Sequence, residues 1–395
     1  MNAPILSSVK INLPTDSGKL ETFILSEPRA YPGKASATFN RVAFSAAHVV
    51  ADARAANDPW PDASVDWDQT LRYREYLWDL GLGVAEAMDT AQRGMGLDWP
   101  TSLELIRRSV AAANARGGAL VFSGAGTDHL ALDAVKTIDD VAAAYEEQIA
   151  AIEAVGGRII LMSSRALAAV ARSAEDYAAI YDRVLSQVRE PVIIHWLGDM
   201  FDPALAGYWG TPDLDAAMDI AVSVINTNAA KIDGVKVSLL DKEKEIAMRR
   251  RLAPGVRMYT GDDFNYAELI AGDADGYSHA LLGIFDAIAP AASAALVSLA
   301  KGDAASFHDI LAPTVPLSRH IFRAPTRFYK TGVVFMAYLN GYQDHFTMVG
   351  GQESARSTLH LAELFRLADA AGLLRDPELA TRRMRTVLAA RGIEA

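Results

Sequence analysis

The chain has 395 residues, of which 51% are hydrophobic and 22% are charged, so it has enough apolar material for a packed core and is not globally disordered. Its formal net charge of −11 at pH 7 argues against a nucleic-acid or anionic-membrane partner, because both would repel an acidic surface. Since the chain contains no cysteine, disulfides, zinc–thiolate sites and a cysteine nucleophile are excluded.

The first predicted region covers residues 1–40. KINLP and ETFIL alternate polar and apolar positions around a TDSGK turn, which predicts a short hairpin extension. The N-terminal stretch has no basic region followed by an apolar run, and no apolar stretch approaches the ~20 residues that span a bilayer. We therefore expect a cytoplasmic protein that acts on small molecules, with no nucleic-acid or membrane partner.

The second region, residues 41–300, alternates short β-prone runs with longer segments rich in Ala, Leu, Glu and Arg, which is typical of parallel strands joined by crossover helices. The predicted strands are RVAFSAAHVV, LGVAEAMDTA, GALVFSGAG, GRIILMSS, EPVIIHWLG, DGVKVSLL, VRMYTGDD and ADGYSHALL. Eight is the count that a closed (β/α)8 barrel, the TIM barrel, requires. An open doubly wound sheet is the rival fold, but no glycine fingerprint for a dinucleotide follows the first strand.

Helices separate these strands, and TSLELIRRSVAAANA is an example whose apolar residues recur at about 3.6-residue spacing. Several of them begin at Thr, Ser or Asp followed by acidic residues, as helix N-termini prefer. The third region, residues 301–395, is predicted to be a helical extension that packs on the barrel or forms a subunit contact. Its segment RAPTRFYKTGVVF, with Tyr329 and Lys330, could line a mouth for an anion, but we expect a solvated turn between helices.

The C-terminal ends of barrel strands carry the reactive groups of barrel enzymes. Polar side chains are frequent at these predicted positions: Ser45, His48, Asp89, Thr90, Ser123, Asp128, His129, Ser163, Ser164, Arg165, His195, Asp199, Asp262, Asp263, Ser278 and His279. We expect these side chains to converge on the mouth of the barrel.

Lys236 is the most informative single residue, because DGVKVSLL places an ammonium among apolar residues in a strand predicted to be buried. Burial of an unpaired charge is costly, and desolvation lowers the pKa of a lysine. A neutral amine is the nucleophile that forms an imine with a ketone or aldehyde. The alternative is a structural lysine that pairs with a barrel carboxylate or reaches solvent at a strand end.

The order of motifs around Lys236, namely EPVIIHWLG, KIDGVKVSLLDK and YTGDDFNYAELIAGDADGYSHALL, resembles the dihydrodipicolinate synthase and N-acetylneuraminate lyase superfamily. The similarity covers roughly residues 40–300, and within the superfamily it points to an uncharacterised bacterial branch, a domain family of unknown function. The resemblance implies a barrel in which Lys236 forms a Schiff base with a keto acid. Two later motifs of the family match Gly261, Asp262 and Asp263, and then Gly272, Asp275 and Gly276.

Two departures from the family pattern concern the proton relay and the carboxylate clamp. His195 stands where the family has a tyrosine that relays protons to the imine, and a histidine can also exchange protons near neutral pH. The alternative for His195 is a neutral core histidine. The family's G-T-T-G-E loop reads MDTAQRG here, which keeps Thr90 but places Gln92 and Arg93 nearby, and Arg93 could hold a carboxylate.

The first functional hypothesis is therefore a class I lyase, aldolase or hydratase that acts on a small keto-acid or sugar-derived carbonyl substrate without a cofactor. Lys236 and His195 would be catalytic. The residues expected to position substrate groups are Thr90, Gln92, Arg93, Ser123, Asp262, Asp263, Ser278 and His279. The family resemblance also implies a homo-oligomer.

The second hypothesis is a metal-dependent sugar isomerase or epimerase on the same barrel, since imidazole and carboxylate suit zinc or manganese. Its ligands would come from a set of histidines and aspartates: His48, Asp89, His129, His195, Asp262 and His279. A barrel that binds a small molecule without catalysis is the third hypothesis.

Overall fold

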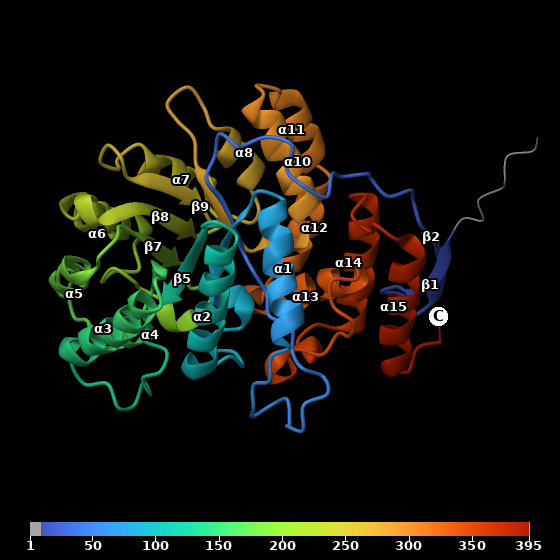
Figure 1. The fold of residues 1–395 in the computed structure, drawn as a ribbon, viewed down its shortest axis with the longest axis horizontal. Coiled ribbons are helices and arrows are strands. Elements are labelled where there is room, and N and C mark those ends of the chain that lie inside the picture. The colour runs from blue at the N-terminus through green and yellow to red at the C-terminus, as the bar shows by residue number, and fades with distance from the viewer. Residues whose placement is uncertain (1–8, 395) are drawn as a thin grey trace, which may run out of the picture.

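The computed structural model describes residues 9–394 (Figure 1). Eight parallel strands close into a barrel in the order β10, β3, β4, β5, β6, β7, β8 and β9, which confirms the predicted TIM barrel. Their bounds are β3 (Ala43–Ala46), β4 (Gly83–Glu86), β5 (Val121–Ala125), β6 (Arg158–Met162), β7 (Val192–Leu197), β8 (Ile232–Ser238), β9 (Arg257–Thr260) and β10 (His279–Leu282). The strands are shorter than the predicted runs, because most runs include part of the following loop.

Helices connect these strands and cover the outside of the barrel. They are α1 (Trp67–Asp79), α2 (Trp99–Ala115), α3 (Ile138–Ala154), α4 (Arg165–Val170), α5 (Ala174–Gln187), α6 (Leu214–Thr227), α7 (Lys242–Arg249), α8 (Tyr266–Ala271), α9 (Ile284–Ala287) and α10 (Ala289–Ala300). The described chain also contains short 3₁₀ helices: η1 (Asp89–Ala91), η2 (Pro203–Leu205), η3 (Ala229–Lys231), η4 (Thr326–Phe328) and η5 (Val349–Ser354).

Polar residues at the helix starts act as N-caps, as the sequence suggests. Thr137 forms a capping box with Asp140 at the start of α3. Asp98 caps α2 and accepts a hydrogen bond from the Thr101 backbone, so this helix begins two residues before its predicted start. The capping chemistry therefore sets helix boundaries that periodicity alone does not resolve.

The barrel strands face two hydrophobic layers, because successive side chains point to opposite faces of a strand. The interior of the barrel is filled by one cluster of buried side chains: Phe44, Ala46, Ala85, Met88, Phe122, Ile160, Ile193, Tyr259 and Leu281. The outward-facing residues join a second, larger cluster with the helices. The interior is thus packed at mid-height, and polar groups are left for its ends.

The chain beyond the barrel continues as α11 (Ala304–Leu311), α12 (Thr314–Ile321), α13 (Tyr329–Leu339), α14 (Thr358–Ala370) and α15 (Pro377–Ala390). All eleven residues of α13 are buried, and this helix contacts α9 and η1 of the barrel as well as α14 and α15. Figure 1 shows these helices in orange and red beside the barrel. The extension therefore shares a core with the barrel through α13.

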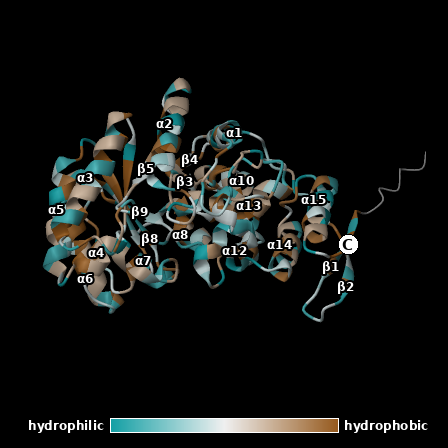
Figure 2. Cartoon of the chain, turned by 90° about the horizontal axis from the view of Figure 1, so that it is seen from below, coloured by the Kyte–Doolittle hydropathy of each residue, from teal (hydrophilic) through white to brown (hydrophobic). Residues whose placement is uncertain are grey.

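The N-terminal hairpin consists of β1 (Lys10–Pro14) and β2 (Leu20–Ile24), which pair antiparallel as predicted. It packs against α14 and α15 at the end of the molecule furthest from the barrel (Figure 2). Arg385 and Arg366 donate hydrogen bonds to the carbonyls of Lys10 and Pro14. Within residues 9–394, no helix is long and apolar enough to cross a membrane.

Candidate active site

Lys236 points into the barrel. Its neighbours Val235 and Val237 belong to the outer hydrophobic layer, so Lys236 and Ser238 face the interior. A Cβ atom placed on Gly261 would lie only 2.8 Å from Lys236 Cε, which shows how closely the lysine passes the end of β9. The side chain is buried, with 7% of the residue exposed. The prediction that this strand lysine is desolvated is therefore confirmed.

Burial governs the electrostatics of this amine. Loss of solvation lowers the pKa of Lys236, and the carboxylates of Asp263 and Asp89 oppose that change. Burial likewise raises the pKa of Asp263, whose Oδ1 accepts a hydrogen bond from the Ile284 backbone at the start of α9. The opposite charges of Lys236 and Asp263 favour each other, whereas burial disfavours both, so the neutral amine is more accessible here than on an exposed lysine.

His195 lies on β7 directly opposite Lys236 in the strand ladder. Its Nε2 is 3.2 Å from Ser238 Oγ, and no described residue pairs with its buried Nδ1. Burial lowers the pKa of His195 well below its usual value, and the nearby Lys236 acts in the same direction. The histidine is therefore a neutral imidazole with one ring nitrogen free for a ligand.

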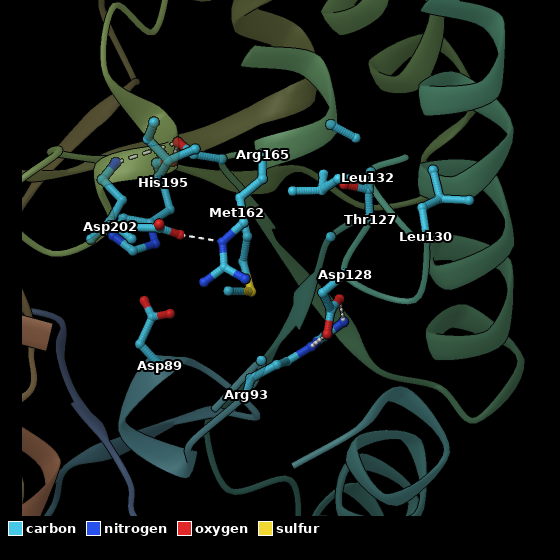
Figure 3. A pocket seen from close by; sticks show the side chains of 16 residues that line it. Asp89, Arg93, Thr127, Asp128, Leu130, Leu132, Met162, Arg165, His195 and Asp202 are labelled. Carbon is cyan, nitrogen blue, oxygen red and sulfur yellow. Dashed lines mark hydrogen bonds and ion pairs between the residues drawn. The ribbon is translucent and has the colours of Figure 1, made fainter. Parts of the chain in front are cut away.

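A cavity of about 80 Å³ opens above His195 at the C-terminal mouth of the barrel. Figure 3 shows the Asp89 carboxylate and the Arg165 guanidinium extending into it from opposite sides. Arg165 Nε is paired with Asp202, while no described residue accepts a hydrogen bond from its two terminal nitrogens. Met162 and Leu132 line the cavity on its apolar side. The cavity therefore offers the Asp89 carboxylate and the two terminal nitrogens of Arg165, in addition to the free ring nitrogen of His195.

Tyr329 was expected in a solvated turn, but the structure buries it at the barrel mouth. Its hydroxyl lies 2.7 Å from Thr90 Oγ1, and its ring stacks on Phe322 with centroids 4.3 Å apart. Burial raises the pKa of Tyr329 well above its usual value, and Asp89 adds to this effect. Thr90 thus lies at the mouth as predicted, and its partner is a residue from outside the barrel.

Lys330, the next residue on α13, is a second buried lysine. Its Nζ donates to the Arg327 carbonyl at 3.0 Å and lies 3.1 Å from Met95 Sδ. Burial lowers the pKa of Lys330 to about 8, against the attraction of Asp89. Unlike Lys236, Lys330 is anchored by a helix outside the barrel, so it provides an internal comparison for lysine chemistry.

Arg93 does not offer a carboxylate clamp, which corrects the sequence-based prediction. Its Nε and one terminal nitrogen donate to Asp128, and the remaining donors bind the carbonyls of Ala87 and Gly124 and the side chain of Gln148. All five N–H groups of a guanidinium are thereby used. Arg93 lines the cavity, but its hydrogen bonds go to neighbouring protein groups and leave no donor for a ligand.

Gln92 also has a structural role, since its Nε2 donates to the Val349 carbonyl at 2.6 Å and ties the loop after β4 to η5. Ser123 faces away from the barrel interior, because its neighbour Phe122 belongs to the interior cluster. Asp262 caps its own turn by accepting hydrogen bonds from Phe264 and Asn265. None of these three residues presents a free group to the cavity, contrary to the prediction.

Ser278 and His279 lie at the opposite end of the barrel from the predicted position. His279 begins β10, and its Nδ1 accepts a hydrogen bond from the Val42 backbone. Ser278 precedes the strand and donates to Glu245 Oε1 at 2.7 Å. The predicted strand ADGYSHALL was too long at its start, so residues placed at its end in fact lie near its beginning.

The predicted metal ligands do not come together. His48 Nδ1 is bound to Asp286, and His129 Nδ1 lies 2.7 Å from the Gln148 amide. In the described part of the chain, no three His, Asp or Glu side chains are arranged to hold a metal ion. The sequence predicted convergence from strand ends alone, whereas side-chain direction separates these groups.

Solved structures with a similar fold include dihydrodipicolinate synthase from Aquifex aeolicus, with a TM-score of 0.58, 14% identity, and coverage of 90% of this chain and 99% of that one. A prophage protein of the dihydrodipicolinic acid synthase family from E. coli, solved in complex with pyruvate, gives a TM-score of 0.64 at 14% identity, with 85% and 99% covered. Dihydrodipicolinate synthase from Bacillus clausii gives 0.61 at 15% identity, with 82% and 96% covered.

These similarities establish the dihydrodipicolinate synthase fold that the sequence motifs indicate. No protein with a curated description matches the chain. The family described as protein of unknown function (DUF993) matches residues 11–393, and the chain therefore belongs to this family.

Proposed function

We propose that the protein is a class I lyase of the aldolase type, in which Lys236 forms an imine with a small keto acid. The observation that carries this proposal is the position of Lys236, a desolvated amine inside the barrel, level with His195 and within the electrostatic influence of the Asp263 carboxyl group. A neutral amine is required to attack a carbonyl, and burial favours the neutral form by lowering the pKa of Lys236. The fold shared with dihydrodipicolinate synthases supports the same chemistry.

The proposed reaction begins with formation of an imine between Lys236 and the substrate. The Lys236 nitrogen attacks the carbonyl carbon, the carbonyl oxygen takes up protons, and water leaves to give a protonated imine. Cleavage of the bond between the α- and β-carbons of the imine then gives an enamine, with the electron pair taken up through the α-carbon to the imine nitrogen. A base removes the proton of the β-hydroxyl group, and the carbon that carries it leaves as an aldehyde, the first product. Protonation of the enamine carbon and hydrolysis release the second product and restore Lys236.

The groups at the barrel mouth have matching roles in this proposal. The free terminal nitrogens of Arg165 bind the keto-acid carboxylate, because a guanidinium fits a carboxylate with two donors. Asp89 accepts a hydrogen bond from a substrate hydroxyl. The Thr90–Tyr329 hydroxyl pair and the neutral His195 exchange protons with the reacting atoms.

Borohydride trapping tests the proposal directly. The protein is incubated with pyruvate, or with a longer 2-keto acid, and sodium borohydride, and the adduct is located by peptide mass spectrometry. We expect a mass increase at Lys236 equal to that of the keto acid minus one oxygen atom, since an imine forms and is then reduced.

The matched variants are Lys236→Met and Lys330→Met, which each remove one buried amine. We expect no adduct in Lys236→Met and an unchanged adduct in Lys330→Met. An adduct that moves to Lys330, or that persists without Lys236, would show that the assignment of the nucleophile is wrong.

A further inference from the structure

A second cavity, of about 140 Å³, lies where the barrel meets both of its extensions. Its walls come from α1, α9 and α13, from residues 29–33 ahead of the barrel, and from the loop between α14 and α15. It is separate from the cavity above His195, with which it shares no lining residue. We name it the extension cavity.

Aromatic rings form one wall of the extension cavity. Tyr342 packs against Tyr76 with ring centroids 4.6 Å apart and against the edge of Tyr73 at 5.3 Å. The hydroxyls of Tyr76 and Tyr342 are hydrogen-bonded to each other at 2.7 Å, so both are satisfied within the wall. The rings therefore present their apolar faces and edges, which suit contact with another flat ring.

Unused polar groups lie at the same cavity. The Tyr31 hydroxyl is buried and makes no hydrogen bond to any described residue. The Arg375 guanidinium lies over the Tyr342 ring at 4.9 Å, at the exposed rim, and no described carboxylate forms an ion pair with it. A buried orphan hydroxyl is costly unless a ligand or water completes it. The two groups therefore indicate an occupant with an acceptor group and a negative charge.

The size of the extension cavity limits the occupant. An apolar cavity of about 150 Å³ engineered in another protein accommodates benzene. The extension cavity is of similar volume, so a single aromatic ring fits its interior, and a substituent can reach the rim. Larger molecules such as dinucleotides do not fit.

We propose that the extension cavity binds a small aromatic or heteroaromatic carboxylate, with its ring against Tyr73 and Tyr342 and its carboxylate at Arg375. The acceptor needed by the Tyr31 hydroxyl comes from a polar substituent of the same molecule. This binding site is independent of the lyase assignment, because it uses no residue of the mouth cavity.

The site is connected to the barrel interior through α9. Asp286, which lines the extension cavity, accepts hydrogen bonds from His48 and Tyr73. Two residues earlier on the same short helix, the Ile284 backbone donates to Asp263 at 2.8 Å, and the Asp263 carboxyl group interacts electrostatically with Lys236. An occupant that contacts Asp286 therefore touches the helix that positions the carboxyl group beside the buried amine.

Isothermal titration calorimetry of the full chain with 4-hydroxybenzoate tests the proposal, with benzyl alcohol as the uncharged probe and acetate as the probe without a ring. We expect saturable binding of 4-hydroxybenzoate only. The matched variants are Arg375→Gln, which removes the rim cation, and Tyr31→Phe, which removes the orphan hydroxyl. Arg382→Gln, an exposed arginine on α15, is the control.

Arg375→Gln is expected to weaken 4-hydroxybenzoate binding about tenfold or more, Tyr31→Phe several-fold, and Arg382→Gln not at all. Lys236→Met is expected to bind as the unaltered chain does, since the mouth cavity is not involved. The proposal is overturned if 4-hydroxybenzoate does not saturate the protein at ~10 mM. It is also overturned if acetate or benzyl alcohol binds equally well, if Arg375→Gln has no effect, or if binding disappears in Lys236→Met.

Discussion

The hydroxyl of Tyr329 lies 2.7 Å from that of Thr90, although 239 positions separate the two residues in the chain. Thr90 belongs to the loop that follows β4, whereas Tyr329 begins a helix of the C-terminal extension. The extension therefore supplies a phenol to the mouth of the barrel, and His195 is not the only group there that can exchange a proton.

We expect Tyr329→Phe to lower kcat by about 10² or more, because proton transfer by a positioned group contributes on that scale. Imine formation with Lys236 should remain detectable by borohydride trapping, since the amine is untouched. The free energy of unfolding should fall by only about 1 kcal/mol, the value of one hydrogen bond. Tyr338→Phe, on the same helix, is the matched control, and equal loss of activity in both variants would contradict a specific role for the Tyr329 hydroxyl.

Arg165→Gln should raise the KM for a keto acid about tenfold or more with a smaller effect on kcat, because the substrate carboxylate loses a charged partner in the ground state and the transition state alike. Steady-state kinetics of the variant and the unaltered chain give KM and kcat separately. Arg172→Gln alters an exposed arginine just after α4 and should leave both constants unchanged. An unchanged KM in Arg165→Gln would remove Arg165 from the substrate site.

The pH dependence of trapping should reflect the lowered pKa of Lys236. A lysine whose folded pKa lies below its ordinary value becomes neutral at a lower pH, so the trapping rate rises with pH and levels off below the value of about 10.4 that is typical of an exposed lysine. Mass spectrometry of the adduct, sampled over time at each pH, gives the profile. A profile that follows that of an exposed lysine would mean that the amine is not desolvated in solution.

Glu245 should make the protein less stable as the pH rises. Burial raises its pKa to about 8, while the unfolded chain has the ordinary value near 4.5. Between these values the unfolded state releases a proton that the folded state keeps, so the free energy of unfolding falls as the pH rises through this window, by on the order of 2 kcal/mol or more.

Urea unfolding between pH 5 and pH 9 measures this loss, and Glu245→Gln should reduce it because the amide does not titrate. Glu243→Gln, an exposed neighbour on α7, should keep the original slope. If the slope of Glu245→Gln equals that of the unaltered chain, Glu245 does not control it.

The barrel could be predicted from sequence because eight alternations of strand and helix leave few other arrangements. Positions within strands were harder to predict. The run ADGYSHALL yields a strand of only four residues, since Asp273 and Gly276 form a turn before it. A misplacement of a few residues therefore moved His279 from one end of the barrel to the other.

Side-chain direction and distant contacts explain the remaining differences. Ser123 was assigned to the mouth by its place along β5, but its parity in the strand turns it toward the helices. The burial of Lys236 was predicted correctly, because a charge in an apolar strand is visible in the local sequence. The hydrogen-bond partners of Thr90 and His48 lie more than 200 positions away in the sequence, and no local sequence pattern predicts such pairs. The homo-oligomer stays a prediction.

The order in which the chain is synthesised gives the packing of α13 a further consequence. The last barrel strand ends at Leu282, but Tyr329 emerges from the ribosome later, and the hairpin must wait for α15 before it can dock. A nascent chain can therefore close its barrel, and with it the mouth cavity lined by residues 89–205, while the extension cavity still lacks the walls that α13 and the loop before α15 supply. We expect ligand binding at the extension cavity to mature late in biogenesis, after the barrel itself has formed.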